Sequence, residues 1–331
     1  MSLSLRQKAD FYRELGQLLR SGTPFLGAVK LLQGETRGPV RKLLNKLHAA
    51  VEIGRTVGEA FMAQRPVVSD LEASIIGACA RTGRIDQGCA YLSDYFAKLD
   101  AARSFIIRKS LYPAFVLHFG VFSTALPKLV SESGTLNAYL RSTVGVLLLF
   151  YGCCIIVGLA TSLIISEGAR STMVDQLLRM IPGLGKMRRA FALSRFCATY
   201  EMQLQSGVNV MDALTSASNA SQSALVRQAV KKAVPLVRGG SQVGPLLSGS
   251  RAFTEAMVRG IKIGEETGAL DQELKRLADT FQQEALSRLE LLSGIIAKFL
   301  YLMVMGYVAW QIFGFYSGYF KQVESFGNLQ Q

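Results

Sequence analysis

The sequence has few of the residues that build disulfides, metal sites and catalytic centres. Its 331 residues include five cysteines and two histidines. The cysteines are Cys79, Cys89, Cys153, Cys154 and Cys197. Their number is odd and none forms a C-x-x-C pair, so the pattern predicts reduced thiols rather than a disulfide framework or a zinc site. His48 and His118 lie far apart and accompany no nucleophile motif, which leaves triad and metal chemistry almost nothing to use.

Motifs for phosphate binding and for signal-peptide cleavage are also missing. The pair Gly185-Lys186 is followed by Met187 rather than by Ser or Thr. Met180 stands where a phosphate-binding loop has its first glycine. Residues 1–20 carry several charges and no apolar run. We therefore expect neither nucleotide hydrolysis nor a cleavable signal peptide.

Charged residues are scarce, at 18% of the chain, whereas 50% of the residues are hydrophobic. Disorder requires low hydrophobicity, so this composition excludes a disordered polyelectrolyte. The mean hydropathy of +0.26 implies more apolar surface than one core of this size usually hides. Membrane-spanning helices are the first explanation to test.

Three uncharged stretches are close to the roughly 20 residues that a helix needs to cross a bilayer. They are Ser110–Pro127, Ser142–Ser166 and Phe299–Phe320. We predict transmembrane helices over residues 110–130, 142–166 and 295–320. A buried helix of a soluble core is the alternative, although core helices of this length usually carry a polar stripe. The first stretch contains Pro113, which a helix tolerates near its start, and His118, for which packing and function are both open.

Positive charge sets the orientation of these spans. The chain has 37 Lys+Arg against 24 Asp+Glu, and segments 1–109 and 167–294 carry most of them. Basic residues near the spans are Arg103, Arg108, Lys109, Lys186, Arg188 and Arg189. Because cytoplasmic segments carry the excess of Lys and Arg, we expect both long segments in the cytoplasm and residues 131–141 and 321–331 in the periplasm. No nucleic-acid recognition motif accompanies these charges, so we expect no nucleic-acid partner.

The two long segments are copies of one domain, offset by 185 residues. Equivalent pairs are Phe11 and Phe196, Gly22 and Gly207, Gly83 and Gly268, and Asp86 and Asp271. Apolar residues recur every three or four positions in each copy, and no stretch outside the spans alternates as a strand does. We therefore predict an all-α fold with two repeated helical bundles and three transmembrane helices.

Short polar segments carry the residues that end one helix and begin the next. In Ser21–Pro24 we predict a glycine stop, an N-cap at Thr23 and a first helical residue at Pro24. In the second copy, Asn209 and Asp212 are suited to capping.

A second signal of this kind is the Thr-Gly pair in each copy. Thr82-Gly83 and Thr267-Gly268 predict helix ends. Asp86 and Asp271 follow at the right distance to cap the next helix.

These features resemble the F-component family of type II secretion systems, which includes the inner-membrane platform proteins of type IV pilus machines. The most specific segment, Gly264-Glu265-Glu266-Thr267-Gly268-Ala269-Leu270-Asp271, is similar to the family signature G-E-x-T/S-G-x-L-[DE]. Two further segments are similar to family landmarks: Ile181-Pro182-Gly183-Leu184-Gly185, and Lys109-Ser110-Leu111-Tyr112-Pro113 at the start of the first span. In the first copy, Cys79-Ala80-Arg81 replaces Gly264-Glu265-Glu266. The chain begins close to its first repeat, which favours a pilus platform over a secretion platform.

The resemblance implies a non-enzymatic scaffold without a cofactor. It implies an inner-membrane location, contact with a cytoplasmic assembly ATPase, and handling of pilin or pseudopilin subunits at the membrane helices. Other inner-membrane assembly proteins and further copies of the chain are the remaining implied partners. A small transporter is the rival class, because repeated halves with membrane helices are common in transporters. The uncharged spans offer no acid or base for ion coupling, which weighs against it.

For the acidic motif we predict a role in capping and domain packing, with cation binding by Glu265, Glu266 and Asp271 as the alternative. We expect Gly268→Val to disturb the domain, because this glycine is suited to a positive φ. We expect Glu265→Gln and Glu266→Gln to leave the fold largely intact.

Overall fold

The computed structural model describes residues 3–125, 144–145, 148, 151–152, 155, 171–181 and 183–327. Every regular element within these ranges is an α-helix, which confirms the predicted all-α class. The chain divides into two compact units. The first unit holds Met1–Ala102 and Ser166–Leu289, and the second holds Arg103–Ile165 and Glu290–Gln331. Both repeats therefore belong to the first unit.

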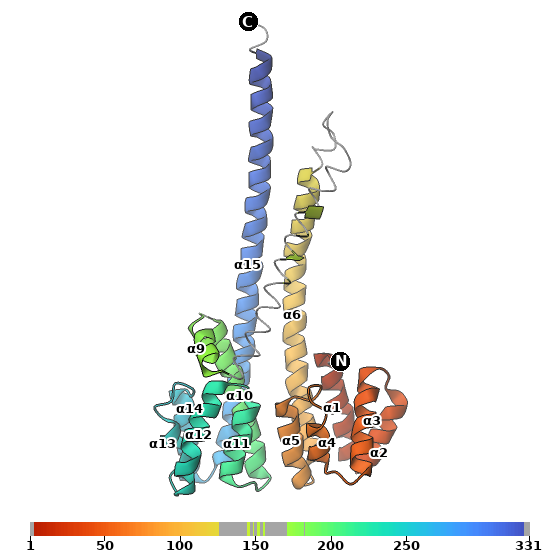
Figure 1. The fold of residues 1–331 in the computed structure, drawn as a ribbon, viewed down its shortest axis with the longest axis vertical. Coiled ribbons are helices and arrows are strands. Elements are labelled where there is room, and N and C mark those ends of the chain that lie inside the picture. The colour runs from red at the N-terminus through yellow and green to blue at the C-terminus, as the bar shows by residue number, and fades with distance from the viewer. Residues whose placement is uncertain are drawn as a thin grey trace. The chain divides into compact units, whose positions relative to one another are not determined.

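Repeat 1 is a helical bundle drawn in red to yellow in Figure 1. Its helices are α1 (Leu5–Arg20), α2 (Phe25–Glu35), α3 (Pro39–Glu52), α4 (Val57–Met62), α5 (Asp70–Arg81) and the first part of α6 (Ile85–Ala125). Tyr12 is fully buried between the rings of Phe61 and Phe96. The Tyr12 hydroxyl donates to the buried carboxylate of Glu72 at 2.8 Å, and Lys8 binds the same carboxylate at 2.6 Å. The one acid in this core is thus paired, as a buried charge must be.

Repeat 2 is a second bundle, drawn in green to blue in Figure 1. Its helices are α10 (Leu184–Gln205), α11 (Val210–Ala220), α12 (Ala224–Arg238), α13 (Val243–Leu247), α14 (Glu255–Thr267) and the first part of α15 (Leu270–Gly327). Phe196 and Tyr200 on α10 are fully buried, and Phe196 meets Phe253 edge to face at 5.4 Å. The short helix α9 (Thr172–Met180) precedes this bundle and packs on α10 and α12.

The predicted turn after the first helix is confirmed at its glycine and wrong at its cap. Helix α1 ends at Arg20, and Gly22 has a φ of 87°. Pro24, not Thr23, is the N-cap of α2, because a ψ of 149° keeps Pro24 outside the helix. In repeat 2 the predicted cap is confirmed, since the Asn209 side chain accepts from the Met211 N–H at 2.9 Å.

The two repeats meet through different faces of their common bundle. Helix α5 of repeat 1 packs against α10 and α11 of repeat 2, whose equivalents in repeat 1 are α1 and α2. Arg81, the last residue of α5, donates to the Gln203 side-chain oxygen at 2.7 Å. The Gln203 amide in turn donates to the Ser74 carbonyl at 3.4 Å. The contact is therefore head to tail rather than two-fold symmetric.

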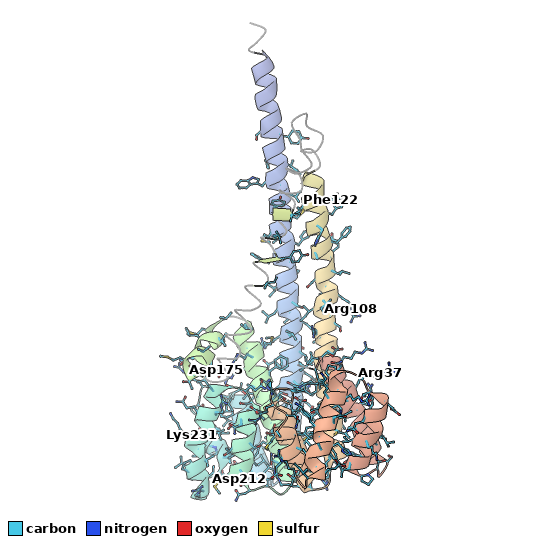
Figure 2. All side chains as sticks on the ribbon, turned by 45° about the vertical axis from the view of Figure 1, so that its right-hand side comes forward. Arg37, Arg108, Phe122, Asp175, Asp212 and Lys231 are labelled. Carbon is cyan, nitrogen blue, oxygen red and sulfur yellow. The ribbon has the colours of Figure 1, made fainter. Side chains whose placement is uncertain are left out.

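The second unit contains the parts of α6 and α15 that run past the repeats. Within the described residues, one helical segment, Ile85–Phe122, has the length and apolar character to cross a membrane, and Tyr301–Gly314 is a shorter apolar stretch. The first of these overlaps the predicted first span. Most of the predicted middle span, 142–166, and all of the predicted loop, 131–141, lie outside the described residues. Figure 2 shows side chains, among them Phe122, standing out along α6.

Candidate functional site

The acidic motif forms the turn between α14 and α15. Helix α14 ends at Thr267, and Gly268 has φ 69° and ψ 10°, in the left-handed region. This geometry confirms the predicted glycine stop, because residues with a Cβ adopt that region only at a cost. The Thr267 hydroxyl donates to the Ile263 carbonyl at 2.8 Å and closes the last turn.

Gly264 lets α14 and α15 approach closely. A Cβ at this position would lie 2.8 Å from the Leu270 Cα and 3.3 Å from the Glu273 Cβ. Because no side chain can fit at such distances without moving a backbone, the first glycine of the motif is required by packing. Leu270, also in the motif, supplies the opposing surface.

The two glutamates of the motif have different surroundings. The Glu265 carboxylate accepts from the Val243 N–H at 2.7 Å and from the Gly244 N–H at 2.8 Å. It thereby caps α13 from a neighbouring helix, because helix N-termini leave backbone N–H groups without partners. Glu266 is exposed and forms an ion pair with Lys262 at 3.8 Å. The expectation that Glu265→Gln leaves the fold largely intact conflicts with this geometry, whereas for Glu266 the expectation stands.

Asp271 and Asp86 lie inside their helices rather than before them. Helix α15 begins at Leu270 and α6 begins at Ile85, so each aspartate is the second helical residue. The predicted N-cap role is therefore wrong, because the helix has already started one residue earlier. An acid in the first turn still interacts favourably with the helix dipole, and Asp86 lies 4.0 Å from Arg20.

Repeat 1 builds the same turn with different residues. Helix α5 ends at Arg81, and Gly83 has a φ of 70°. Cys79, which replaces Gly264, packs against Gly88 on α6, where an added Cβ would lie 2.9 Å from the Cys79 sulfur. Gly88 is equivalent to Glu273. The glycine at this helix crossing therefore lies on the second helix (α6) in repeat 1 and on the first helix (α14) in repeat 2.

Glu201 on α10 is an acid that the sequence reasoning missed. Its side chain is buried, and burial raises its pKa to about 7. Lys275 acts in the opposite direction, whereas Asp271 and Asp279 raise the pKa further. The signal in the sequence is a charged residue on a largely apolar face of α10, next to Tyr200 and one turn after Cys197.

A pocket of about 520 Å³ lies beside Glu201 and receives residues from both repeats. Its lining includes Arg20, Thr82, Arg84, Tyr91, Lys275 and Asp279. The pocket therefore brings the Thr-Gly turn of repeat 1 next to α10 and α15 of repeat 2. Charges of both signs line it, and the described part of the chain contains no group of three His, Cys, Asp or Glu residues placed to hold a metal.

The residues predicted at the start of the first span lie along α6. Lys109 lies over the Phe105 ring at 4.4 Å, and Tyr112 stacks on Tyr301 of α15 at 6.3 Å. Pro113 is accommodated within α6. Five residues after it, the His118 ring contacts the Ala114 carbonyl at 2.7 Å and the Tyr151 hydroxyl at 3.0 Å. These contacts favour the helix-packing reading of His118.

Comparison with known proteins divides the chain into the same two repeats. The profile of the family "Type II secretion system (T2SS), protein F" matches twice, over residues 11–127 and 196–318. These matches confirm the internal repeat, and the chain belongs to this family.

Curated relatives come from both kinds of machine that the resemblance named. The chain is 24% identical over 89% of its length to the type II secretion system protein F of Vibrio cholerae, covering 77% of that protein. It is 25% identical over 96% of its length to the type IV pilus assembly protein PilC of Thermus thermophilus, covering 82% of that protein. A third relative is the type IV pilus assembly protein TapC of Aeromonas hydrophila, 22% identical over 93% of this chain and covering 79% of TapC.

Proposed function

We infer that this protein is the platform of a type IV pilus or type II secretion machine: a non-enzymatic scaffold in the bacterial inner membrane. One observation carries this inference. Each of the two family matches contains a helical repeat and the long helix that follows it, α6 or α15, whose later part is apolar. A folded domain that continues into an apolar helix is suited to connecting events in the cytoplasm to the membrane. The names of the relatives favour this role over that of a transporter.

The proposed topology has three spans, at 110–130, 142–166 and 295–320, with repeat 1 (1–109) and repeat 2 (167–294) in the cytoplasm. The loop 131–141 and the tail 321–331 would then be periplasmic. The excess of Lys and Arg in the two repeats supports this orientation.

Cysteine labelling in cells tests the topology. A cysteine at Ser133, in the predicted loop, should react with a membrane-impermeant maleimide. A cysteine at Ser241, an exposed residue between α12 and α13, should react only after the cells are opened. Native Cys79, Cys89 and Cys197 are buried and should contribute little background. Labelling of Ser241→Cys but not Ser133→Cys in intact cells would contradict the topology.

The middle span is tested separately by charge. Cys154→Arg should reduce correct insertion by about 2.5–3.5 kcal/mol if residue 154 lies near the bilayer centre. Ser133→Arg, in the predicted loop, is the matched control and should insert normally. Equal insertion of both variants would indicate that residues 142–166 do not span the membrane.

The proposed partners are a cytoplasmic assembly ATPase, pilin or pseudopilin subunits, other inner-membrane assembly proteins and further copies of this chain. Full-length protein in lipid nanodiscs should capture the assembly ATPase of its host and should hydrolyse no nucleotide by itself. Deletion of its gene should abolish pili or type II secretion without removing the ATPase. Solute flux in liposomes containing only this protein, with no ATPase capture, would support the transporter alternative instead.

A further inference from the structure

Helix α9 presents an apolar stripe to its surroundings. Met173, Leu177 and Met180 are 78%, 64% and 76% exposed, respectively. Their spacing of four and then three residues places them on one face of the helix. Ile181, directly after the helix, is 47% exposed and extends the stripe. Three large exposed apolar side chains on a helix of nine residues need a covering surface.

The opposite face of α9 is fixed to repeat 2. Asp175 is buried, and its carboxylate accepts from Arg188 of α10 at 3.2 Å and from the Ser223 hydroxyl at 2.5 Å. The same carboxylate accepts from the backbone N–H of Leu225 at 3.2 Å, so it binds the start of α12 as well. Asp175 is labelled in Figure 2. This anchoring holds the apolar stripe outward, away from the core of repeat 2.

Helix α9 packs against the start of α10, where Asp175 accepts from Arg188. Contacts between α10 and α15 show that these helices are antiparallel. Ser194 donates to the Ala278 carbonyl at 3.0 Å, and Arg189, nearer the start of α10, interacts with Glu284, farther along α15. Since α9 directly precedes α10, it belongs to the end of the repeat from which α15 continues into its apolar part.

The chain also brings α9 close to the proposed middle span. That span ends at residue 166, and the N-cap of α9 is Ser171. Five residues of fully extended chain cover about 17 Å, so the start of α9 cannot lie far from the membrane surface.

Positive charge accompanies the stripe. Lys186 is exposed at the start of α10. A pocket of about 780 Å³ near the same end of α10 is lined by Arg251 and Arg259, which are exposed, and by Glu255. Arg189 also lines it and donates to the Ala252 and Phe253 carbonyls. Anionic headgroups of the cytoplasmic leaflet attract such groups of Lys and Arg.

We propose that α9 is an interfacial helix, with Met173, Leu177 and Met180 inserted at the headgroup boundary of the cytoplasmic leaflet and the nearby basic residues facing anionic lipid. The amphipathic pattern and the basic flank match the general properties of such helices. A stripe of three side chains is also much smaller than the roughly 800 Å² per partner of a stable protein interface. The inference rests on the proposed topology and assigns repeat 2 a fixed contact with the lipid surface.

Tryptophan quenching tests this assignment in the full-length protein. The chain has one tryptophan, Trp310, so Trp310→Phe gives a silent background. Leu177→Trp places a probe on the stripe. Val210→Trp is the matched control, because Val210 is an exposed apolar residue that follows the opposite end of α10. Both variants are reconstituted into vesicles of phosphatidylethanolamine and phosphatidylglycerol, with and without brominated lipid.

Brominated lipid should quench Leu177→Trp at least about twofold more than Val210→Trp, and aqueous acrylamide should show the reverse order. Equal acrylamide quenching of the two probes would overturn the proposal, because the stripe would then face water. Protection of Leu177→Trp from acrylamide without quenching by brominated lipid would also overturn it, because a protein surface would then cover the stripe. Labelling of Ser133→Cys in the same preparations tests the proposed topology independently of the interfacial helix. If Ser133→Cys is labelled as expected but Leu177→Trp is exposed to water, the interfacial helix is rejected and the platform topology is retained.

Discussion

The two repeats have the same bundle architecture but stabilise its shortest helix, α4 in repeat 1 and α13 in repeat 2, in different ways. In repeat 1, α4 is capped by its own residues: Thr56 accepts from the Glu59 N–H, and the Glu59 carboxylate accepts from the Thr56 N–H. In repeat 2, Gln242 precedes α13 and its side chain makes no cap hydrogen bond. The carboxylate of Glu265 supplies that cap from α14.

The reason for this difference lies in one proline. Pro245 occupies the third position of α13, where a capping box needs a backbone N–H that proline lacks. The remaining N–H groups, on Val243 and Gly244, are the two that Glu265 binds. Repeat 1 has Ala80 in place of Glu265 and does not need the acid. The loss of the acidic motif from repeat 1 is therefore compensated locally, and it is compatible with the same fold.

The largest effect is expected at the crossing of the last two helices. Gly264→Val should destabilise repeat 2 by about 3 kcal/mol, because its Cβ would lie 2.8 Å from the Leu270 backbone. Gly34→Ala is the control: Gly34 has open space around it on α2, so alanine there should be neutral or slightly stabilising. Thermal unfolding of the full chain in detergent measures both. Equal melting temperatures would show that the crossing tolerates a side chain.

The second comparison concerns Glu201, whose equivalent in repeat 1 is Gly16. The folded pKa of about 7 lies above the ordinary value of 4.5, so the native state binds more protons than the unfolded state in that interval. Stability should therefore fall as the pH rises from 4.5 through 7, by an amount on the order of 2–3 kcal/mol. Glu201→Gln should remove much of this loss and should be more stable than the parent at pH 8. A parent protein with a melting temperature independent of pH in this interval would contradict the burial of an ionisable Glu201.

Next in size is the cap of α13. Glu265→Gln should cost about 2 kcal/mol, because two hydrogen bonds to a charged group weaken, whereas Glu266→Gln should change stability by less than about 0.5 kcal/mol. A rescue experiment tests directly whether Glu265 replaces the missing capping box of α13. Adding Gln242→Thr and Pro245→Glu gives α13 the capping box of α4, and Glu265→Gln should then cost less. An unchanged cost in that background would show that Glu265 acts elsewhere.

The smallest effect should be the same in both repeats. Gly83→Val and Gly268→Val both place a Cβ at a φ near 70°, so each should cost about 1–2 kcal/mol. Chemical denaturation of the two variants tests whether the turns are equivalent. A cost at Gly268 alone would mean that the turn of repeat 2 carries a constraint which repeat 1 lacks. Gly268→Val that lost ATPase capture at wild-type stability would contradict the structural role of this turn.

Local features of the fold could be predicted from the sequence because they depend on neighbouring residues. The repeat offset, the all-helical pattern and the stop at Gly268 are of this kind. The cap at Asn209 is another. The misplaced caps at Thr23 and Asp271 are errors of one or two residues at helix starts, where several polar residues compete for the same role.

Contacts between helices could not be predicted in the same way. Nothing in the sequence places Glu265 beside Val243, because that pairing depends on how α13 and α14 cross. The absence of a side chain at Gly244 favours the close approach: a Cβ there would lie 3.1 Å from the Lys262 Cα, which is a tight contact. The burial of Glu201 likewise requires α15 to lie along α10. Sequence spacing shows the apolar face of α10, but it does not show what covers that face.

The continuity of α15 has a mechanical consequence. This helix has 58 residues, about 87 Å at 1.5 Å per residue, and its sequence contains no proline. Helix α6 contains Pro113, which removes one backbone hydrogen bond from its ladder. Loads applied to the two repeats would therefore meet unequal bending resistance: Pro113 creates a point of lower resistance near the start of the apolar part of α6, and α15 has no proline to create one.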